Sequence, residues 1–247
     1  MNGADPAGAG AAPDPPADPP AEVAGAARAV FGDTLDDAVA FAGMLVTDGV
    51  VRGVVGPREA PRIWQRHLLN CAVLAERIPP GASVIDVGSG AGLPGLALAI
   101  ARPDLPVLLL EPMARRTGFL TEAVTRLRLE GRVTVVRARA EEAAGKVPEA
   151  DVVTARAVAP LDRLAAWCLP LAVRGGRVLA MKGSTAPSEI QAHAAVISRL
   201  GGSVPVVTLC GVGVLDPPAT VVEIVRERPA RPAPPRRDNA RRRRPGG

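Results

Sequence analysis

The sequence predicts an α/β domain built on a mainly parallel sheet of seven strands, with helices on both faces. Apolar runs alternate with segments of helical periodicity along the middle of the chain, which is typical of parallel sheets whose crossovers are helices. The last two apolar runs, 204–210 and 219–226, are joined by a loop rich in glycine and proline. That pattern predicts a closing antiparallel hairpin.

The individual elements follow from periodicity and from turn residues. Two helices are expected first, over 34–50 and 58–77. The second carries one stripe that consists of Ile63, His67, Cys71 and Leu74, with Trp64 beside it. The predicted strands cover 83–87, 106–110, 132–137, 151–154, 176–181, 204–210 and 219–226. Later helices are expected up to residue 101 and over 113–129, 160–172 and 187–200. We expect both tryptophans, Trp64 and Trp167, in the core.

The two ends of the chain differ from its middle in composition. Residues 1–22 are mostly Ala, Pro, Gly and Asp, and residues 228–247 alternate Arg with Pro. Neither segment can bury enough apolar surface to offset the entropy of ordering, so we expect both to be disordered. Between them we expect an N-terminal helical extension over 23–80 and a cofactor-binding core over 81–227.

The net charge of +5 is unevenly distributed. Residues 228–247 hold eight arginines and one aspartate, and residues 1–22 hold four acidic residues and no basic one, which leaves +2 for 23–227. A basic tail favours an anionic partner such as nucleic acid. The chain has no tyrosine and only five phenylalanines and tryptophans together. RNA binding would therefore depend on arginine, backbone amides and shape rather than on a platform of stacked bases.

Three further features limit the class of protein. No stretch approaches the roughly 18 apolar residues of a membrane span. No basic start followed by an apolar run marks a secretory signal in the first 30 residues. Cys71, Cys168 and Cys210 are scattered without CxxC spacing, which argues against a disulfide framework or a zinc cluster. We therefore expect a cytoplasmic protein with no metal ion and no membrane partner.

A glycine-rich turn follows the first predicted strand and opens a helix, with the sequence Asp86-Val-Gly88-Ser-Gly90-Ala-Gly92-Leu93-Pro94-Gly95. Glycine permits positive φ and close approach of the backbone to a ligand. The second strand ends at Glu111, where a carboxylate can accept hydrogen bonds from both hydroxyls of a ribose. These features predict a site for a nucleoside-containing cofactor.

Two cofactors are compatible with this turn. Residues 90–95 satisfy the G-x-G-x-x-G pattern of dinucleotide-binding proteins, so an NAD(P)-dependent oxidoreductase stays open as an alternative. Three features favour S-adenosyl-L-methionine. Asp86 stands two residues before the first glycine, where it is placed to meet the cationic methionine end. We expect the sheet to close with an antiparallel hairpin, and we expect no second catalytic unit after it.

The combination of motifs resembles one enzyme family. The segments VIDVGSGAGLPGLALAIARPDLPVLLLEP (84–112), TARAVAPLDRL (154–164) and MKG (181–183) are similar to the small-subunit ribosomal RNA guanine-N7 methyltransferases, the glucose-inhibited division protein B family. RIWQRHLLNCAVL (62–74) resembles a helix of that family. The resemblance covers about residues 34–226. It implies a class I, Rossmann-like methyltransferase fold and methyl transfer from S-adenosyl-L-methionine to N7 of a guanosine in 16S rRNA.

The resemblance also implies cofactor contacts at six positions. They are Gly88 and Leu93 in the turn, Glu111 at the ribose, Ala140 and Glu141 near the adenine, and Arg156 after the fourth strand. The family helix usually has the sequence His-x-x-Asp-Ser, whereas this chain has His67, Asn70 and Cys71 at those positions. An amide therefore replaces a carboxylate, and a role that requires negative charge there is not carried over.

Methyl transfer to guanine N7 needs no general base, because N7 offers a lone pair and loses no proton. Catalysis then depends on alignment and electrostatics. The catalytic candidates are Arg156, Lys182 and His67. Arg156 follows the fourth strand, at the edge where ligands bind, and Lys182 is one of only two lysines against 28 arginines. His67 lies on a largely apolar stripe, where a histidine more often only packs.

We expect a monomer whose partner is 16S rRNA or a small-subunit assembly particle. Three alternatives stay open at this point. They are a methyltransferase of the same fold with a small-molecule substrate, an NAD(P)-dependent oxidoreductase, and a non-catalytic ribosome assembly factor.

Overall fold

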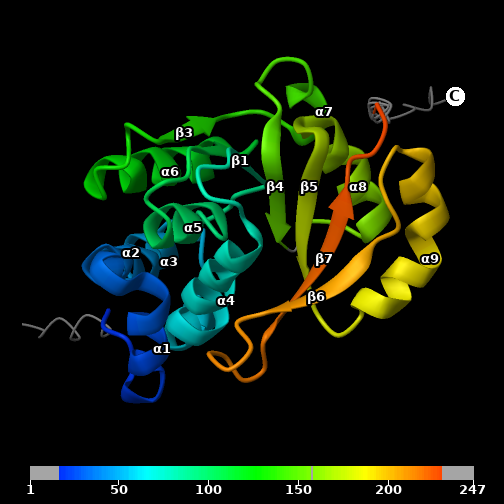
Figure 1. Cartoon of the computed structure of the whole chain (residues 1–247). Helices are drawn as coiled ribbons and strands as arrows, with labels where there is room; N and C mark the ends of the chain where they lie inside the picture. The colour runs from blue at the N-terminus through cyan, green and yellow to red at the C-terminus, as the bar shows by residue number, and fades with distance from the viewer. Residues whose placement is uncertain (1–16, 157, 230–247) are drawn as a thin grey trace, which may run out of the picture.

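The computed structural model describes residues 17–156 and 158–229, so the disorder expected for 1–16 and 230–247 lies outside the described residues. In the described part, seven strands form one sheet in the order β3-β2-β1-β4-β5-β7-β6 (Figure 1). The strands are β1 Val84–Val87, β2 Val107–Leu110, β3 Val133–Val136, β4 Ala150–Arg156, β5 Ala172–Lys182, β6 Val206–Cys210 and β7 Ala219–Val225. Strands β1 to β5 pair in parallel, and β7 runs antiparallel to both β5 and β6. The predicted mainly parallel sheet with a closing hairpin is confirmed.

Helices cover both faces of this sheet. The α-helices are α1 Ala21–Phe31, α2 Leu35–Val46, α3 Asp48–Val51, α4 Asn70–Ala72, α5 Gly95–Ala101, α6 Ala114–Arg126, α7 Ala140–Ala143, α8 Leu161–Cys168 and α9 Ala186–Arg199. Shorter 3-10 segments are η1 Gly32–Thr34, η2 Pro57–Arg62, η4 Val73–Arg77 and η5 Leu169–Leu171. Helices α1 to α6 gather on one side of the sheet, and α7, α8 and α9 on the other (Figure 1).

Each face has its own buried apolar cluster, and β1 contributes to both. Side chains alternate between the faces of a strand. Val84 belongs to the cluster on the side of α2, α5 and α6, whereas Ile85 and Val87 belong to the cluster on the side of α8 and α9. A strand buried on both faces reads as a continuous apolar run, which is why the strands could be found in the sequence.

The N-terminal helical extension begins earlier than the composition indicates. Helix α1 starts at Ala21, inside the segment 1–22 that we expected to be disordered. The indole N–H of Trp64 donates a hydrogen bond to the carbonyl of Ala17 at 2.8 Å, and Phe31 meets Trp64 edge-on with ring centroids 6.2 Å apart. These contacts join parts of the chain that are distant in sequence, so local composition does not reveal them.

The single helix expected over 58–77 is four short segments in the structure: η2, the π-helix η3 (Ile63–Leu69), α4 and η4. Pro61 lies inside η2, and a proline within a helix removes one backbone donor. The predicted stripe is nevertheless buried, at Ile63, His67, Cys71 and Leu74. Sequence periodicity therefore identified the buried face correctly but not the helical geometry.

Within 17–156 and 158–229, no helix is long and apolar enough to cross a membrane. In the same ranges, no group of three or more His, Cys, Asp and Glu side chains is arranged to hold a metal ion. Cys71, Cys168 and Cys210 are free thiols and are buried.

Candidate functional site

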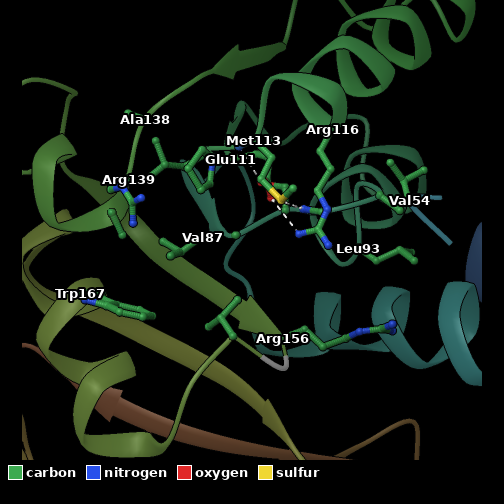
Figure 2. A pocket seen from close by; sticks show the side chains of 18 of the residues that line it. Val54, Val87, Leu93, Glu111, Met113, Arg116, Ala138, Arg139, Arg156 and Trp167 are labelled. Atoms are coloured by element: carbon green, nitrogen blue, oxygen red, sulfur yellow. Dashed lines mark hydrogen bonds and ion pairs between the residues drawn. The ribbon is translucent and has the colours of Figure 1, made fainter. Parts of the chain in front are cut away.

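A cavity of about 660 Å³ opens at the carboxyl ends of β1, β2 and β4. Its volume is typical of a small-molecule site, and parallel α/β sheets bind ligands at this edge. Figure 2 shows Glu111 and Arg116 on one side of it, Trp167 on another, and Arg156 extending from the end of β4. All six predicted cofactor residues line this cavity, which below is called the cofactor cavity: Gly88, Leu93, Glu111, Ala140, Glu141 and Arg156.

The glycine turn gives this cavity its floor. Gly88 leaves β1 with φ +70°, and a Cβ atom there would lie 2.5 Å from Cγ1 of Val158, which also lines the cavity. Gly92 has φ +91°, and a Cβ atom there would lie 2.5 Å from Cδ1 of Leu96. Both positions therefore need glycine for conformation and for space. A side chain at position 88 would displace the cavity wall.

Asp86 has a different role from the one expected. Its carboxylate is fully buried, accepts a hydrogen bond from the Gly95 N–H at 3.0 Å, and accepts another from the Thr154 hydroxyl at 3.0 Å. Burial raises the pKa of Asp86 to about 6. Asp86 does not line the cofactor cavity, so the expectation that it meets the cationic end of a ligand is wrong. It ties β1 to the start of α5 and to β4.

Glu111 holds the other side of the turn. One carboxylate oxygen accepts a hydrogen bond from the Gly90 N–H and the other from the Met113 N–H, each at 3.0 Å. Arg116 approaches it at 3.8 Å. Because each carboxylate oxygen can accept more than one hydrogen bond, Glu111 is both fixed in place and able to accept from ribose hydroxyls.

The remaining wall suits a planar base. Apolar lining comes from Val87, Leu110, Met113, Ala138 and Ala140. Trp167, expected in the core, is partly exposed and lines the same cavity (Figure 2). A carboxylate that can accept further hydrogen bonds beside an apolar wall fits a nucleoside, so the residues present match the kind of cofactor that the turn predicts.

Arg156 points toward the N-terminal extension. Its guanidinium lies 2.5 Å from Nδ1 of His67 and donates to Sγ of Cys71 at 3.0 Å. Nε2 of His67 lies 2.7 Å from the Glu59 carboxylate. Since arginine can only donate, Nδ1 accepts and the proton is on Nε2. The three side chains form a chain of hydrogen bonds from β4 to η2, below called the Arg156–His67–Glu59 chain.

This arrangement keeps His67 neutral. Burial and the charge of Arg156 lower the pKa of His67, and the hydrogen bond from His67 lowers the pKa of Glu59. Neither ring nitrogen is available as a base, because Nδ1 already accepts and Nε2 already carries a proton. His67 lines the cavity, but its geometry is that of a residue that positions Arg156.

Lys182 lies outside the cofactor cavity. Its ammonium donates to the carbonyl of Ala159 at 2.9 Å and to the Glu189 carboxylate at 2.8 Å. Although burial acts to raise it, the pKa of Glu189 is held below its ordinary value by the hydrogen bond and charge of Lys182. Glu189 also accepts from the Leu161 N–H at 3.0 Å. Lys182 thus fixes the segment that follows β4.

A second cavity of about 430 Å³ adjoins the first. The two share Glu59, His67 and Arg156 as lining residues, so they meet at the Arg156–His67–Glu59 chain. Lys182 and Asn70 line only the second cavity. The structure thus brings Arg156 and His67 to both cavities and places Lys182 in one.

Sequence reasoning missed Glu59 and Trp167. Glu59 precedes His67 by eight residues in an irregular segment, and a lone glutamate there has no motif to mark it. Its importance depends on the 3-10 and π-helical turns that bring it to the ring of His67. The residue type of Trp167 was one signal, because a tryptophan ring with its polar N–H often lies at the boundary between apolar and polar surroundings rather than in the core.

The strand order, the glycine turn and the carboxylate after β2 together define a Rossmann-like, class I methyltransferase fold. Among solved structures, a mitomycin 7-O-methyltransferase is similar with a TM-score of 0.51 and 20% identity, over 83% of this chain and 69% of that one. At that identity the similarity concerns the fold alone.

The chain belongs to the family rRNA small subunit methyltransferase G, which matches residues 34–214. A ribosomal RNA small subunit methyltransferase G of Salinispora tropica is 65% identical over 92% of this chain and 98% of its own length. The protein of the same name from Streptomyces avermitilis is 57% identical over 80% of this chain and 83% of its own.

Proposed function

We propose that this protein transfers a methyl group from S-adenosyl-L-methionine to N7 of a guanosine in 16S rRNA. One observation carries the proposal: a cavity suited to a nucleoside adjoins a second, polar cavity across the Arg156–His67–Glu59 chain. A methyl donor and an acceptor base need two such neighbouring sites. Membership of the rRNA small subunit methyltransferase G family supports an rRNA substrate.

The cofactor would be held by residues of the cofactor cavity. S-adenosyl-L-methionine supplies a methyl group on a positively charged sulfur. Glu111 would accept hydrogen bonds from the ribose hydroxyls, and the apolar wall with Ala140 and Glu141 would take the adenine. The turn from Gly88 to Leu93 would take the rest of the molecule.

The protein's part in the reaction is alignment and electrostatics. Guanine N7 attacks with its own lone pair, so no side chain has to remove a proton. A neutral His67 is consistent with that chemistry, because it supports Arg156 without competing for protons. Arg156 would hold the target base, and Lys182 would fix the segment after β4 on which Arg156 depends. Correct placement of two reactants accounts for up to about 7–11 kcal/mol in favourable cases.

An oxidoreductase is set aside, because the chain belongs to a methyltransferase family. Two alternatives remain for experiment. A small-molecule substrate would leave rRNA unmodified, and a non-catalytic assembly factor would bind RNA without methyl transfer. A 16S rRNA substrate would place the reaction in the cytoplasm.

Mass mapping of 16S rRNA from cells with and without the gene tests the substrate. We expect one N7-methylguanosine to disappear when the gene is deleted, and to return when the purified protein and S-adenosyl-L-methionine are added. An unchanged inventory of N7-methylguanosine would refute the rRNA substrate. Calorimetric titration with S-adenosyl-L-methionine and with NAD tests the cofactor separately, and tight binding of NAD alone would refute the methyltransferase assignment.

A further inference from the structure

The second cavity contains a buried polar atom without a partner. The side-chain oxygen of Asn70 is inaccessible to solvent and has no hydrogen-bond partner in the described part of the chain. A buried acceptor left unpaired is destabilising, and such groups are rare in native proteins. Asn70 also lines the second cavity. A ligand that donates an N–H from this cavity would therefore satisfy it once the Asn70 carboxamide turns its oxygen toward the ligand.

The other carboxylate oxygens of this cavity each have at least one partner. Glu59 accepts from His67 and pairs with Arg66 at 3.6 Å. Glu189 accepts from Lys182, from the Leu161 N–H and from the Thr185 hydroxyl. Among the carboxylates and carboxamides that line the cavity in the described residues, Asn70 is the one whose side-chain oxygen has neither a hydrogen bond nor an ion pair.

Guanine has the complementary arrangement of donors and acceptors. N7 and O6 are acceptors on one edge, whereas the exocyclic amino group donates from the end of the base that lies furthest from N7. If N7 faces the cofactor cavity, the amino group faces away from it. Arg156 lines both cavities and uses two of its contacts on His67 and Cys71. Its five N–H donors leave enough for O6.

We propose that the second cavity binds the target guanine and that the side-chain oxygen of Asn70 accepts a hydrogen bond from its exocyclic amino group. This inference rests on the proposed function. It also explains why an amide is acceptable where the family usually has aspartate, because both side chains offer an oxygen acceptor and the contact needs no negative charge.

A double-mutant cycle between Asn70 and the amino group of the base tests the inference. The substrates are reconstituted small-subunit particles whose 16S rRNA carries either guanosine or inosine at the methylated position. Inosine keeps N7 and O6 and lacks only the amino group. The variants are Asn70→Leu, which removes the acceptor at similar volume, and Gln65→Leu, a matched amide change at an exposed position.

We expect the wild-type protein and Gln65→Leu to methylate the inosine substrate with kcat/KM about tenfold lower than the guanosine substrate. Asn70→Leu should be about tenfold slower on guanosine and should treat the two substrates alike. Its affinity for S-adenosyl-L-methionine should stay within about twofold of wild type, since Asn70 does not line the cofactor cavity. Asn70→Asp, which keeps an acceptor, should retain the preference for guanosine.

The outcomes separate this inference from the proposed function. Wild-type protein that methylates no particle overturns both. The inference alone is overturned if the wild-type protein methylates guanosine at N7 and Asn70→Leu still has a lower kcat/KM for the inosine substrate than for the guanosine substrate. If Asn70→Leu does not fold, loss of the guanosine preference in Asn70→Asp overturns it instead.

Discussion

The two adjoining cavities differ in what shapes them. The floor of the cofactor cavity is main chain, the glycine turn, with Gly88 and Gly92 at positive φ and two buried carboxylates, Asp86 and Glu111, that hold the turn by its N–H groups. The second cavity is formed mostly by polar side chains from η2, η3, α4, β4, β5, α9 and β7. It contains a neutral histidine, an ion pair between Lys182 and Glu189, and a side-chain oxygen of Asn70 that has no partner in the described part of the chain.

This difference indicates how each cavity should respond to change. The main-chain floor leaves no room for a Cβ atom at Gly88, so a side chain there displaces the cavity wall at Val158. In the second cavity a single substitution removes one side-chain hydrogen bond, and each such bond contributes about 0.5–3 kcal/mol. The predictions below test that contrast, from the largest expected effect to the smallest.

Gly88→Val should abolish measurable cofactor binding. The substitution forces a branched side chain into positive φ and against Val158, so the cavity wall must move. Calorimetry with S-adenosyl-L-methionine should give an affinity at least about 100-fold weaker, because several contacts shift together. Gly118→Val is the matched control, since a Cβ there meets nothing within 4 Å. Unaltered affinity in Gly88→Val would place the cofactor elsewhere.

Arg156→Ala should lose activity while the fold stays intact. The change removes the donor that lies between the cavities and leaves Nδ1 of His67 without its partner. Loss of one positioned donor lowers kcat by about 100-fold in comparable sites. Methyl transfer to small-subunit particles measures the effect, with Arg174→Ala as an exposed control. Turnover close to wild type would remove Arg156 from the mechanism.

Lys182→Met and Glu189→Gln should have similar effects, with kcat about tenfold lower and KM for RNA nearly unchanged. Both variants break the same contact that fixes the segment after β4. Lys146→Met, at the exposed second lysine, is the control. A raised KM in Lys182→Met alone would mean that the ammonium touches RNA, as a catalytic or binding residue would.

Asp86→Asn should alter how stability depends on pH. The folded-state pKa of Asp86 is raised by burial from the ordinary 3.8 to about 6. The folded protein therefore binds this proton more tightly than the unfolded chain does, and its contribution to stability falls as pH rises from 5 to 7.5. In urea unfolding, the free energy of unfolding of Asp86→Asn minus that of wild type should be larger at pH 7.5 than at pH 5. A difference that does not vary with pH would contradict the buried, titrating carboxylate.

Removal of residues 230–247 should have the smallest effect on catalysis. It takes away seven arginines and one aspartate. RNA affinity at low salt should weaken, and the slope of log affinity against log salt should flatten by about 0.7–0.9 for each lost phosphate contact. Replacement of these arginines by lysine should preserve the slope. If deletion alters neither affinity nor slope, the basic composition of the tail has no part in RNA binding.

Much of the fold and half of the site were accessible from sequence. The strands could be placed because each is a continuous apolar run between turns. The glycine turn and Glu111, within the 26 residues from Asp86 to Glu111, indicate the edge of the sheet where a cofactor is expected. All six predicted cofactor residues line the cavity. The helix over 58–77 was predicted as regular, because periodicity reports which face is buried and not whether the backbone is α, 3-10 or π.

The sequence by itself determined the alternation of strands and helices, the cofactor turn and the buried stripe around His67, because these depend on neighbours along the chain. Only the tertiary structure decided that Asp86 faces inward, that Trp167 lines the cofactor cavity, and that Arg156 reaches His67 across 89 positions. Hydrogen bonds between distant segments exist only once the N-terminal extension packs beside β4. The direction of a side chain at a strand end is set by that packing rather than by its neighbours.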